Sequence, residues 1–179
     1  ELSTVATDGH RLAICDLNAS IGVAEERQLI VPRKGVLELA RMLADSEDPV
    51  ELALGKNHIR LVKGNSVFTS KLIDGRFPDY QRVIPGNAEK LLRVNREMLR
   101  QDLTRTSILS NEKYRGIRLD ISNNLLKIQA HNPEQEEAVE ELEVSYKDDS
   151  MLIGFNVTYL LDVLGVIDGT DVELRLSDA

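Results

Sequence analysis

Aromatic residues are scarce in this chain of 179 residues, at 4% of the sequence, and tryptophan is absent. Hydrophobic residues still make up 42%, so aliphatic side chains must fill any core. No apolar run approaches the roughly 20 residues that a membrane-spanning helix needs, and no charged and then apolar leader opens the chain. The first residue is Glu1 rather than methionine, which suggests a piece of a longer protein.

Cysteine and histidine are too few to build a chemical site. Cys15 is the only cysteine, so a disulfide framework is excluded and a reducing cytoplasm is the expected location. His10, His58 and His131 lie far apart, and no C-x-x-C, H-E-x-x-H or P-loop motif is present. Asp8 lies close to His10, but no serine or cysteine nucleophile accompanies them in a known pattern. We therefore expect no metal, no cofactor and no enzymatic activity.

Positive charge is also in deficit, since the formal net charge is -8. Residues 131–150 contain eight acidic residues and one lysine, whereas the rest of the chain is close to neutral. Taken alone, the net charge argues against a nucleic-acid-binding protein. Because the acidity is local, the charge pattern allows an asymmetric field with less acidic faces elsewhere.

The apolar pattern predicts an α+β chain. Extended segments are expected from Thr4 to Leu17, and from Val50 to Ile73 as an antiparallel meander. Helices are expected after Pro32, Asn95 and Asn156, because proline suits a first helical turn and asparagine suits an N-cap. Each of these segments carries apolar residues at helical spacing. Further strands are expected around residues 117–121, 126–128, 142–144 and 172–176.

Two parts of the chain repeat. Leu29–Val31, a helix and Val50–Leu54 correspond to Leu152–Gly154, a helix and Val172–Leu176, at an offset of about 122 residues. Each copy is predicted as strand, helix and strand, with a Val-Glu pair at the start of the last strand. An irregular connector bracketed by prolines lies between the copies. Two copies of one α+β unit explain this pattern better than one irregular domain.

Six groups of residues, ordered along nearly the whole chain, carry a family resemblance. They are Ala6–Leu12, Ile30–Gly35, Thr69–Leu72 with Phe77–Tyr80, Ile108–Gly116, Asn132–Ala138 and Gly154–Val157. One such segment would be a weak signal, but the ordered set is specific. The chain resembles the beta subunit of bacterial DNA polymerase III, the sliding clamp family.

The resemblance implies a DNA-clamp fold, with repeated units of antiparallel sheet and helices on the inner face. It implies three similar domains per subunit and two subunits per ring. Residues 1–81 are then expected to be the C-terminal part of the middle domain. Residues 82–179 are expected to be the third domain, truncated before its last strands and C-terminal tail. The implied function is that of a processivity factor that encircles duplex DNA without sequence specificity and tethers the replicative polymerase.

The resemblance also implies a groove between the middle and third domains. Polymerases, the clamp loader and repair proteins would dock short hydrophobic peptides there, between apolar walls and a few polar anchors. The matching residues are Thr7, Gly9, His10, Arg11, Leu12, Pro78, Arg82 and Val83. Without the resemblance, an ordinary turn at Asp8-Gly9 and an ordinary linker at Pro78 would be the better interpretation.

In the family, helices line the hole through which DNA passes. The candidates here are Arg33, Lys34, Arg100 and Arg105, on two helices of slight positive charge. Phosphate contacts are independent of sequence and sensitive to salt, which suits a sliding ring. We rank Arg33 and Lys34 first, because Arg100 and Arg105 point to different sides of their helix. Ordinary solvated faces are the alternative.

An acidic edge matches the family's subunit interface. The residues concerned are Ile108, Leu109, Glu134, Glu136, Glu137 and Glu140. In a homodimer of intact subunits, an acidic edge that meets a basic edge supplies orientation and association rate. The alternative is a strand edge charged to prevent aggregation.

Two other functions stay open at this point. One is a peptide-binding assembly module without DNA encirclement, and the other is a nonspecific nucleic-acid-binding α+β domain. A simple binder would form a direct, salt-sensitive complex with linear duplex DNA, whereas a piece of a clamp would not.

Overall fold

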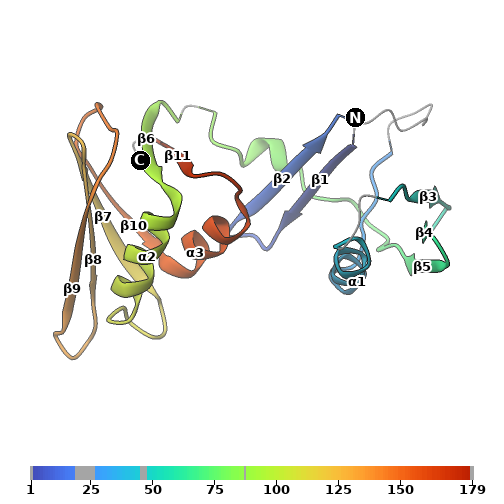
Figure 1. The fold of residues 1–179 in the computed structure, drawn as a ribbon, viewed down its shortest axis with the longest axis horizontal. Helices are drawn as coiled ribbons and strands as arrows, with labels where there is room; N and C mark the ends of the chain where they lie inside the picture. The colour runs from blue at the N-terminus through green and yellow to red at the C-terminus, as the bar shows by residue number, and fades with distance from the viewer. Residues whose placement is uncertain (1, 19–26, 45–47, 87, 178–179) are drawn as a thin grey trace. The chain divides into compact units, whose positions relative to one another are not determined.

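The computed structural model describes residues 2–18, 27–44, 48–86 and 88–177 (Figure 1). The chain divides into two compact units. Unit 1 comprises Glu1–Ala6 and Ala13–Val83, and unit 2 comprises Thr7–Leu12 and Ile84–Ala179. The pairings among the strands from β3 to β11 are antiparallel. With helices beside these sheets, the predicted α+β class is confirmed.

The described residues of unit 1 form two small sheets and one α-helix. Its elements are β1 (Leu2–Thr7), β2 (Leu12–Leu17), α1 (Arg33–Leu43), β3 (Glu51–Leu54), β4 (His58–Lys63), β5 (Ser66–Lys71) and the 3-10 helix η1 (Tyr80–Arg82). Strands β1 and β2 pair with each other, and β3, β4 and β5 form the predicted meander. The ends of β1 and β2, with their connection, are grouped with unit 2.

Helix α1 packs closely on the three-stranded sheet at a glycine. A Cβ atom at Gly35 would lie 3.1 Å from Ser70 Oγ and 3.5 Å from Phe68 Cζ, so glycine lets the helix approach β5. Lys63 Nζ donates a hydrogen bond to the Met42 carbonyl at 2.8 Å. A cation therefore meets the negative end of the α1 dipole, where carbonyls lack helical partners.

The predicted first strand of the repeat in unit 1 is wrong. Leu29–Val31 has no strand conformation. Its one backbone bond to the sheet region joins the Ile73 N–H to the Ile30 carbonyl at 2.8 Å. Pro32 follows at the N-cap of α1, so the segment leads directly into the helix instead of extending a ladder. The order of helix and then strand does recur, as α1 with β3 and α3 with β11.

Where the structure describes it, unit 2 forms two helices and two sheets. Its elements are β6 (Lys90–Asn95), α2 (Arg96–Ser107), β7 (Gly116–Ser122), β8 (Leu125–His131), β9 (Glu137–Glu143), β10 (Met151–Asn156), α3 (Val157–Val166) and β11 (Asp171–Leu176). One sheet has the order β10-β7-β8-β9, and the other pairs β11 with β6. Helix α2 lies along the larger sheet, as Figure 1 shows, and contacts α3.

The two helices of unit 2 begin in the same way. Asn95 ends β6 and caps α2, accepting the Met98 N–H at 3.0 Å, and Asn156 ends β10 and caps α3, accepting the Thr158 N–H at 2.9 Å. Both predicted N-caps are confirmed. The pairing is crosswise, because β6 pairs with the strand after α3 and β10 pairs with the strand after α2.

The core of unit 2 is aliphatic, as the composition predicts. Tyr146, whose hydroxyl donates to the Asp149 carbonyl at 2.6 Å, is the one fully buried aromatic side chain among the described residues. The most deeply buried aliphatic side chains come from both sheets and both helices: Leu92, Leu103, Leu119, Ile121, Leu126, Ile128 and Val157. This core fixes the positions of the helix faces and sheet edges described next.

Candidate functional site

Side chains hold the connection between β1 and β2 in a fixed turn. Asp8 Oδ1 accepts the backbone N–H groups of His10 and Arg11, both at 3.0 Å. Thr7 Oγ1 donates to the Arg11 carbonyl at 2.7 Å and accepts the Gly9 N–H at 3.1 Å. Gly9 has a φ of 87°, which favours glycine. The two backbone donors also lower the pKa of the Asp8 carboxyl from its ordinary value.

Within unit 2, this turn contacts helix α3. Arg11 Nε lies 3.1 Å from Asp8 Oδ2, and a second guanidinium nitrogen donates to Asp162. The same guanidinium stands 5.0 Å from the centroid of the Tyr159 ring, and the His10 ring stacks on that tyrosine at 5.8 Å and 21°. The hydrogen bond that Arg11 donates to Asp162 is the main cause that raises the pKa of Arg11. Arg11 is thus held by two carboxylates and one ring.

Sequence reasoning missed Tyr159 and Asp162. Their spacing of three residues places them on one face of a helix, which is a usable signal once Asn156 is identified as the N-cap. The spacing alone does not indicate that His10 and Arg11 meet this face, because those residues lie far away in the sequence.

The other three candidates for the peptide groove belong to unit 1. Pro78 precedes η1, Arg82 ends it, and the Val83 N–H donates to the Tyr80 carbonyl at 3.1 Å. Arg82 Nε pairs with Asp79 at 2.8 Å, and the Val83 side chain is 68% exposed. Thr7, Gly9, His10, Arg11 and Leu12 form one local group in unit 2. That all eight residues line one groove remains a prediction.

The four candidate DNA-facing cations differ in their partners. Arg33 and Lys34 are exposed in the first turn of α1, and neither forms a hydrogen bond or ion pair with a residue that the structure describes. Arg100 donates two hydrogen bonds to Glu97, at 3.0 and 2.8 Å. Arg105 is held by Asp102 and Glu140. The DNA-facing role of these four residues, and the ranking of Arg33 and Lys34 first, remain predictions.

The Arg100 pair has a clear electrostatic signature. Hydrogen bonds from Arg100, and then from Gln101, lower the pKa of Glu97 from 4.5 to about 2. The same pair raises the pKa of Arg100. The positive charge of Arg100 is therefore balanced within its own helix.

The candidate interface residues lie just after α2, in the turn before β9 and on β9 itself. Ile108 follows α2 with its side chain 75% exposed, and Leu109 is half-buried. Glu134 is exposed, and Glu136 accepts from Asn132 Nδ2 at 2.7 Å. The β9 residues differ from each other, since Glu137 is exposed whereas Glu140 is half-buried and paired with Arg105. Their role in a subunit contact remains a prediction.

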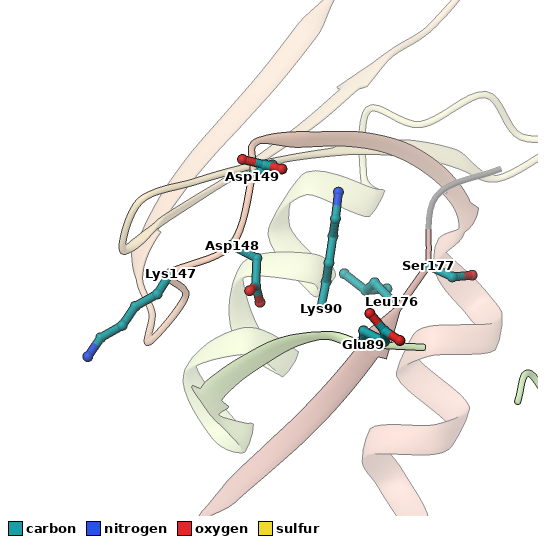
Figure 2. Close-up of a pocket in the computed structure, with 7 residues that line it drawn as sticks. All are labelled: Glu89, Lys90, Lys147, Asp148, Asp149, Leu176 and Ser177. Atoms are coloured by element: carbon teal, nitrogen blue, oxygen red, sulfur yellow. The ribbon is translucent and has the colours of Figure 1, made fainter. Parts of the chain in front are cut away.

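The described surface of unit 2 includes the following two hollows. Figure 2 shows the first, about 410 Å³ in volume, where Lys147 points away from the other labelled side chains. Its lining mixes acids and bases: Glu89, Lys90, Lys147, Asp148, Asp149, Leu176 and Ser177. The second, about 640 Å³, lies over β7, β8 and β10. In the described part of the chain, no cluster of three or more His, Cys, Asp or Glu side chains could hold a metal ion.

No helix within the described ranges is long and apolar enough to cross a membrane.

Comparison with known proteins places this architecture among the DNA clamps. The solved sliding clamp of Pseudomonas aeruginosa bound to griselimycin superposes with a TM-score of 0.95 at 58% identity, over 98% of this chain and 48% of that one. Residues 1–79 match the model for the central domain of the DNA polymerase III beta subunit, and residues 81–179 match the model for its C-terminal domain. The chain therefore belongs to the family of bacterial DNA polymerase III beta subunits.

Two curated relatives give the extent of the match. The beta sliding clamp of Pseudomonas aeruginosa is 58% identical over 178 residues, and that of Escherichia coli is 52% identical over 179 residues. These alignments cover 99% and 100% of this chain, but 48% and 49% of the two relatives. The chain thus spans about half the length of the relatives that it matches.

Proposed function

We propose that this chain is a portion of a sliding clamp, and that this portion contacts both DNA and partner proteins. In a protein of the relatives' full length, two subunits would close a ring around duplex DNA and tether the replicative polymerase. The observation that carries the proposal is the match of residues 1–79 and 81–179 to two consecutive clamp-domain models. The role is that of a non-catalytic accessory subunit in the cytoplasm.

We propose a domain boundary at residues 81/82.

For DNA, we propose that Arg33 and Lys34 supply the phosphate contacts from this chain. Both are exposed at the start of α1, and within the described residues neither has a competing carboxylate. Two exposed cations that no described residue pairs suit a sliding ring, because their contacts with phosphates are weak, screened by salt and independent of sequence. Arg100 and Arg105 contribute less, since each must leave an ion pair to reach a phosphate.

For partner proteins, we propose that the turn at 7–12 and the segment at 78–83 form the peptide-binding groove. Asp8, Tyr159 and Asp162 already hold His10 and Arg11 in place. Less conformational entropy is therefore lost when a peptide binds to them. Val83 offers exposed apolar surface in unit 1. Short hydrophobic peptides of polymerases, the clamp loader and repair proteins are the proposed ligands.

For assembly, we propose that Ile108, Leu109 and the acidic edge form the subunit contact of the homodimer. Ile108 combines a large side chain with 75% exposure, and full burial of such a side chain stabilises a contact by roughly 1.5–3 kcal/mol. Glu134 and Glu137 are exposed acids of the same unit, and they would meet a basic edge.

The experiment that tests the function is a chimera in which this chain replaces the matching half of the Pseudomonas aeruginosa relative. Once loaded, the chimera should stay on closed circular duplex DNA at high salt and should leave when that DNA is linearised. Enclosure, rather than attraction, then explains retention. Arg33→Gln with Lys34→Gln should reduce contact with DNA more than Arg100→Gln alone.

The rival is a peptide-binding assembly module that does not encircle DNA. It predicts that the chimera binds partner peptides but is lost equally from circular and linear DNA. A strong, salt-sensitive complex of the unmodified chain with linear duplex DNA would instead indicate a nonspecific binder and would overturn the clamp proposal.

A further inference from the structure

Edge strand β9 has an acid on its inner face. Among the described strands, β9 is the last of the sheet β10-β7-β8-β9, and helix α2 packs against it. Side chains alternate along a strand, so Ala138, Glu140 and Leu142 share one face. Leu142 is 3% exposed, which identifies that face as the one toward the core. Glu140 therefore occupies a position where the pattern would otherwise place an apolar residue.

Arg105 of α2 forms a bidentate contact with the Glu140 carboxylate. Its Nε donates to Glu140 Oε1 at 2.7 Å, and its Nη2 donates to Glu140 Oε2 at 3.3 Å. The same Nη2 also donates to Asp102, one turn earlier on the helix. One guanidinium thus links the edge strand to a carboxylate of the helix. The planar guanidinium group, with several N–H donors in a fixed geometry, suits this arrangement better than a lysine ammonium would.

Both carboxylates need this partner. The Asp102 side chain is 9% exposed, and its burial raises the pKa of that carboxyl. The Glu140 side chain is 31% exposed, and the hydrogen bond from Arg105 lowers its pKa. Without Arg105, two like charges would face each other at the junction of helix and strand, with no cation between them. Loss of that cation would therefore remove the link between β9 and α2 and weaken the attachment of the strand.

We propose that Arg105 is a positioning residue that holds edge strand β9 against helix α2 through Glu140. This role differs from the DNA-facing one that the sequence suggested for Arg105. Its importance for assembly rests on the proposed function, because β9 and the turn before it carry the acids of the proposed subunit contact. The attachment of β9 itself does not depend on that function.

Arg100 provides a matched control on the same helix. It pairs with Glu97 at the same spacing that separates Arg105 from Asp102. Unlike Arg105, its ion pair stays within the helix and reaches no strand among the described residues. Replacing Arg100 therefore removes an equivalent charge and an equivalent helical ion pair without touching β9.

Native-state hydrogen exchange on the 179-residue chain tests the proposal. In Arg105→Met, the β9 amides bonded to β8 should exchange roughly tenfold faster relative to the β7 and β8 amides, as expected for loss of a hydrogen-bonded charge pair. Glu140→Gln should give a similar local change, and the two substitutions together should add little. Arg100→Met should leave the ratio unchanged, and so should Asp102→Asn, which keeps the Glu140 contact.

Two results would overturn the proposal. One is an unchanged ratio in both Arg105→Met and Glu140→Gln. The other is an equal acceleration throughout β7, β8 and β9, which would mean that Arg105 only stabilises the whole unit. If Arg105→Met does not fold, Arg105→Lys and Glu140→Gln decide the question in the same way. The measurement involves no DNA and no second subunit, so a failure of the clamp proposal would not alter its outcome.

Discussion

The two units of this chain use similar elements but bury very different amounts of apolar surface. In the described part of unit 1, the buried hydrophobic side chains are Ile59 and Leu61, both on β4. Unit 2 buries a continuous cluster drawn from both of its helices and both of its sheets. Val36 and Leu37 on α1 are instead 50% and 45% exposed. Helical spacing of apolar residues therefore does not by itself produce a buried core.

The largest expected effect comes from the unit 2 core. Leu103→Ala should lower the free energy of unfolding of unit 2 by about 2–5 kcal/mol, because Leu103 is fully buried and leaves a cavity. Leu37→Ala on α1 should cost less than about 1 kcal/mol. Urea unfolding followed by tyrosine fluorescence measures the first effect, since Tyr146 lies in the unit 2 core. An equal loss of unfolding free energy in Leu103→Ala and Leu37→Ala would contradict the difference in apolar burial between the two units.

A second pair of substitutions compares a glycine in each unit. Gly35→Leu should destabilise unit 1 by roughly 1–3 kcal/mol, because a side chain there would push α1 away from Ser70 and Phe68. Gly165→Leu in α3 should stabilise unit 2 by about 0.5–1 kcal/mol, since open space surrounds that position. Thermal unfolding of the two variants against the parent chain measures both signs. A stabilising Gly35→Leu would show that α1 does not depend on close approach to the sheet.

The helix caps give a smaller contrast. Asn95→Ala should cost about 1 kcal/mol of unit 2 stability, because the Met98 N–H loses its acceptor. Helix α1 begins after Pro32 without a side-chain cap, so Pro32→Ala should cost less. Denaturant midpoints of the two variants provide the test. Asn95→Asp should retain most of the stability, and a full loss in that variant would argue against capping as the cause.

The smallest effect concerns a surface ion pair of unit 2. Nuclear magnetic resonance titration of the Glu97 carboxyl should give a pKa of about 2 instead of 4.5. Because the folded-state pKa is lowered, the pair stabilises the fold above the ordinary value, and this stabilisation is lost as the pH falls from about 4.5 toward about 2. Arg100→Met should raise the pKa of the Glu97 carboxyl toward 4.5. A Glu97 pKa of about 4.5 in the parent chain would contradict the ion pair between Arg100 and Glu97.

Local signals predict the elements of unit 2 well. Asn95 and Asn156 begin helices as expected, because an N-cap acts on amides only two or three residues away. Leu29–Val31 is not a strand, because a strand needs a neighbouring ladder that the local pattern cannot reveal. The sequence thus predicts elements whose causes are short in range, and it is weaker where a partner strand decides.

The candidate site shows the same division. The turn at Asp8 and Gly9 follows from local hydrogen bonds, so the sequence predicts it. The contact of Arg11 with Asp162 joins distant segments, and its partner could not be inferred from spacing alone. Arg105 is the sharpest case, because spacing along its helix could not reveal that Glu140 of β9 lies beside it.

The crosswise pairing in unit 2 has a consequence for synthesis on the ribosome. Strand β6 is made early, yet the partner for its whole length is β11, which leaves the exit tunnel last among the described strands. Pairing so distant in sequence slows folding, because a long loop must close first. In the nascent chain, β6 therefore remains an open template for other strands until translation of the unit is nearly finished, and a bound chaperone would protect it during that interval.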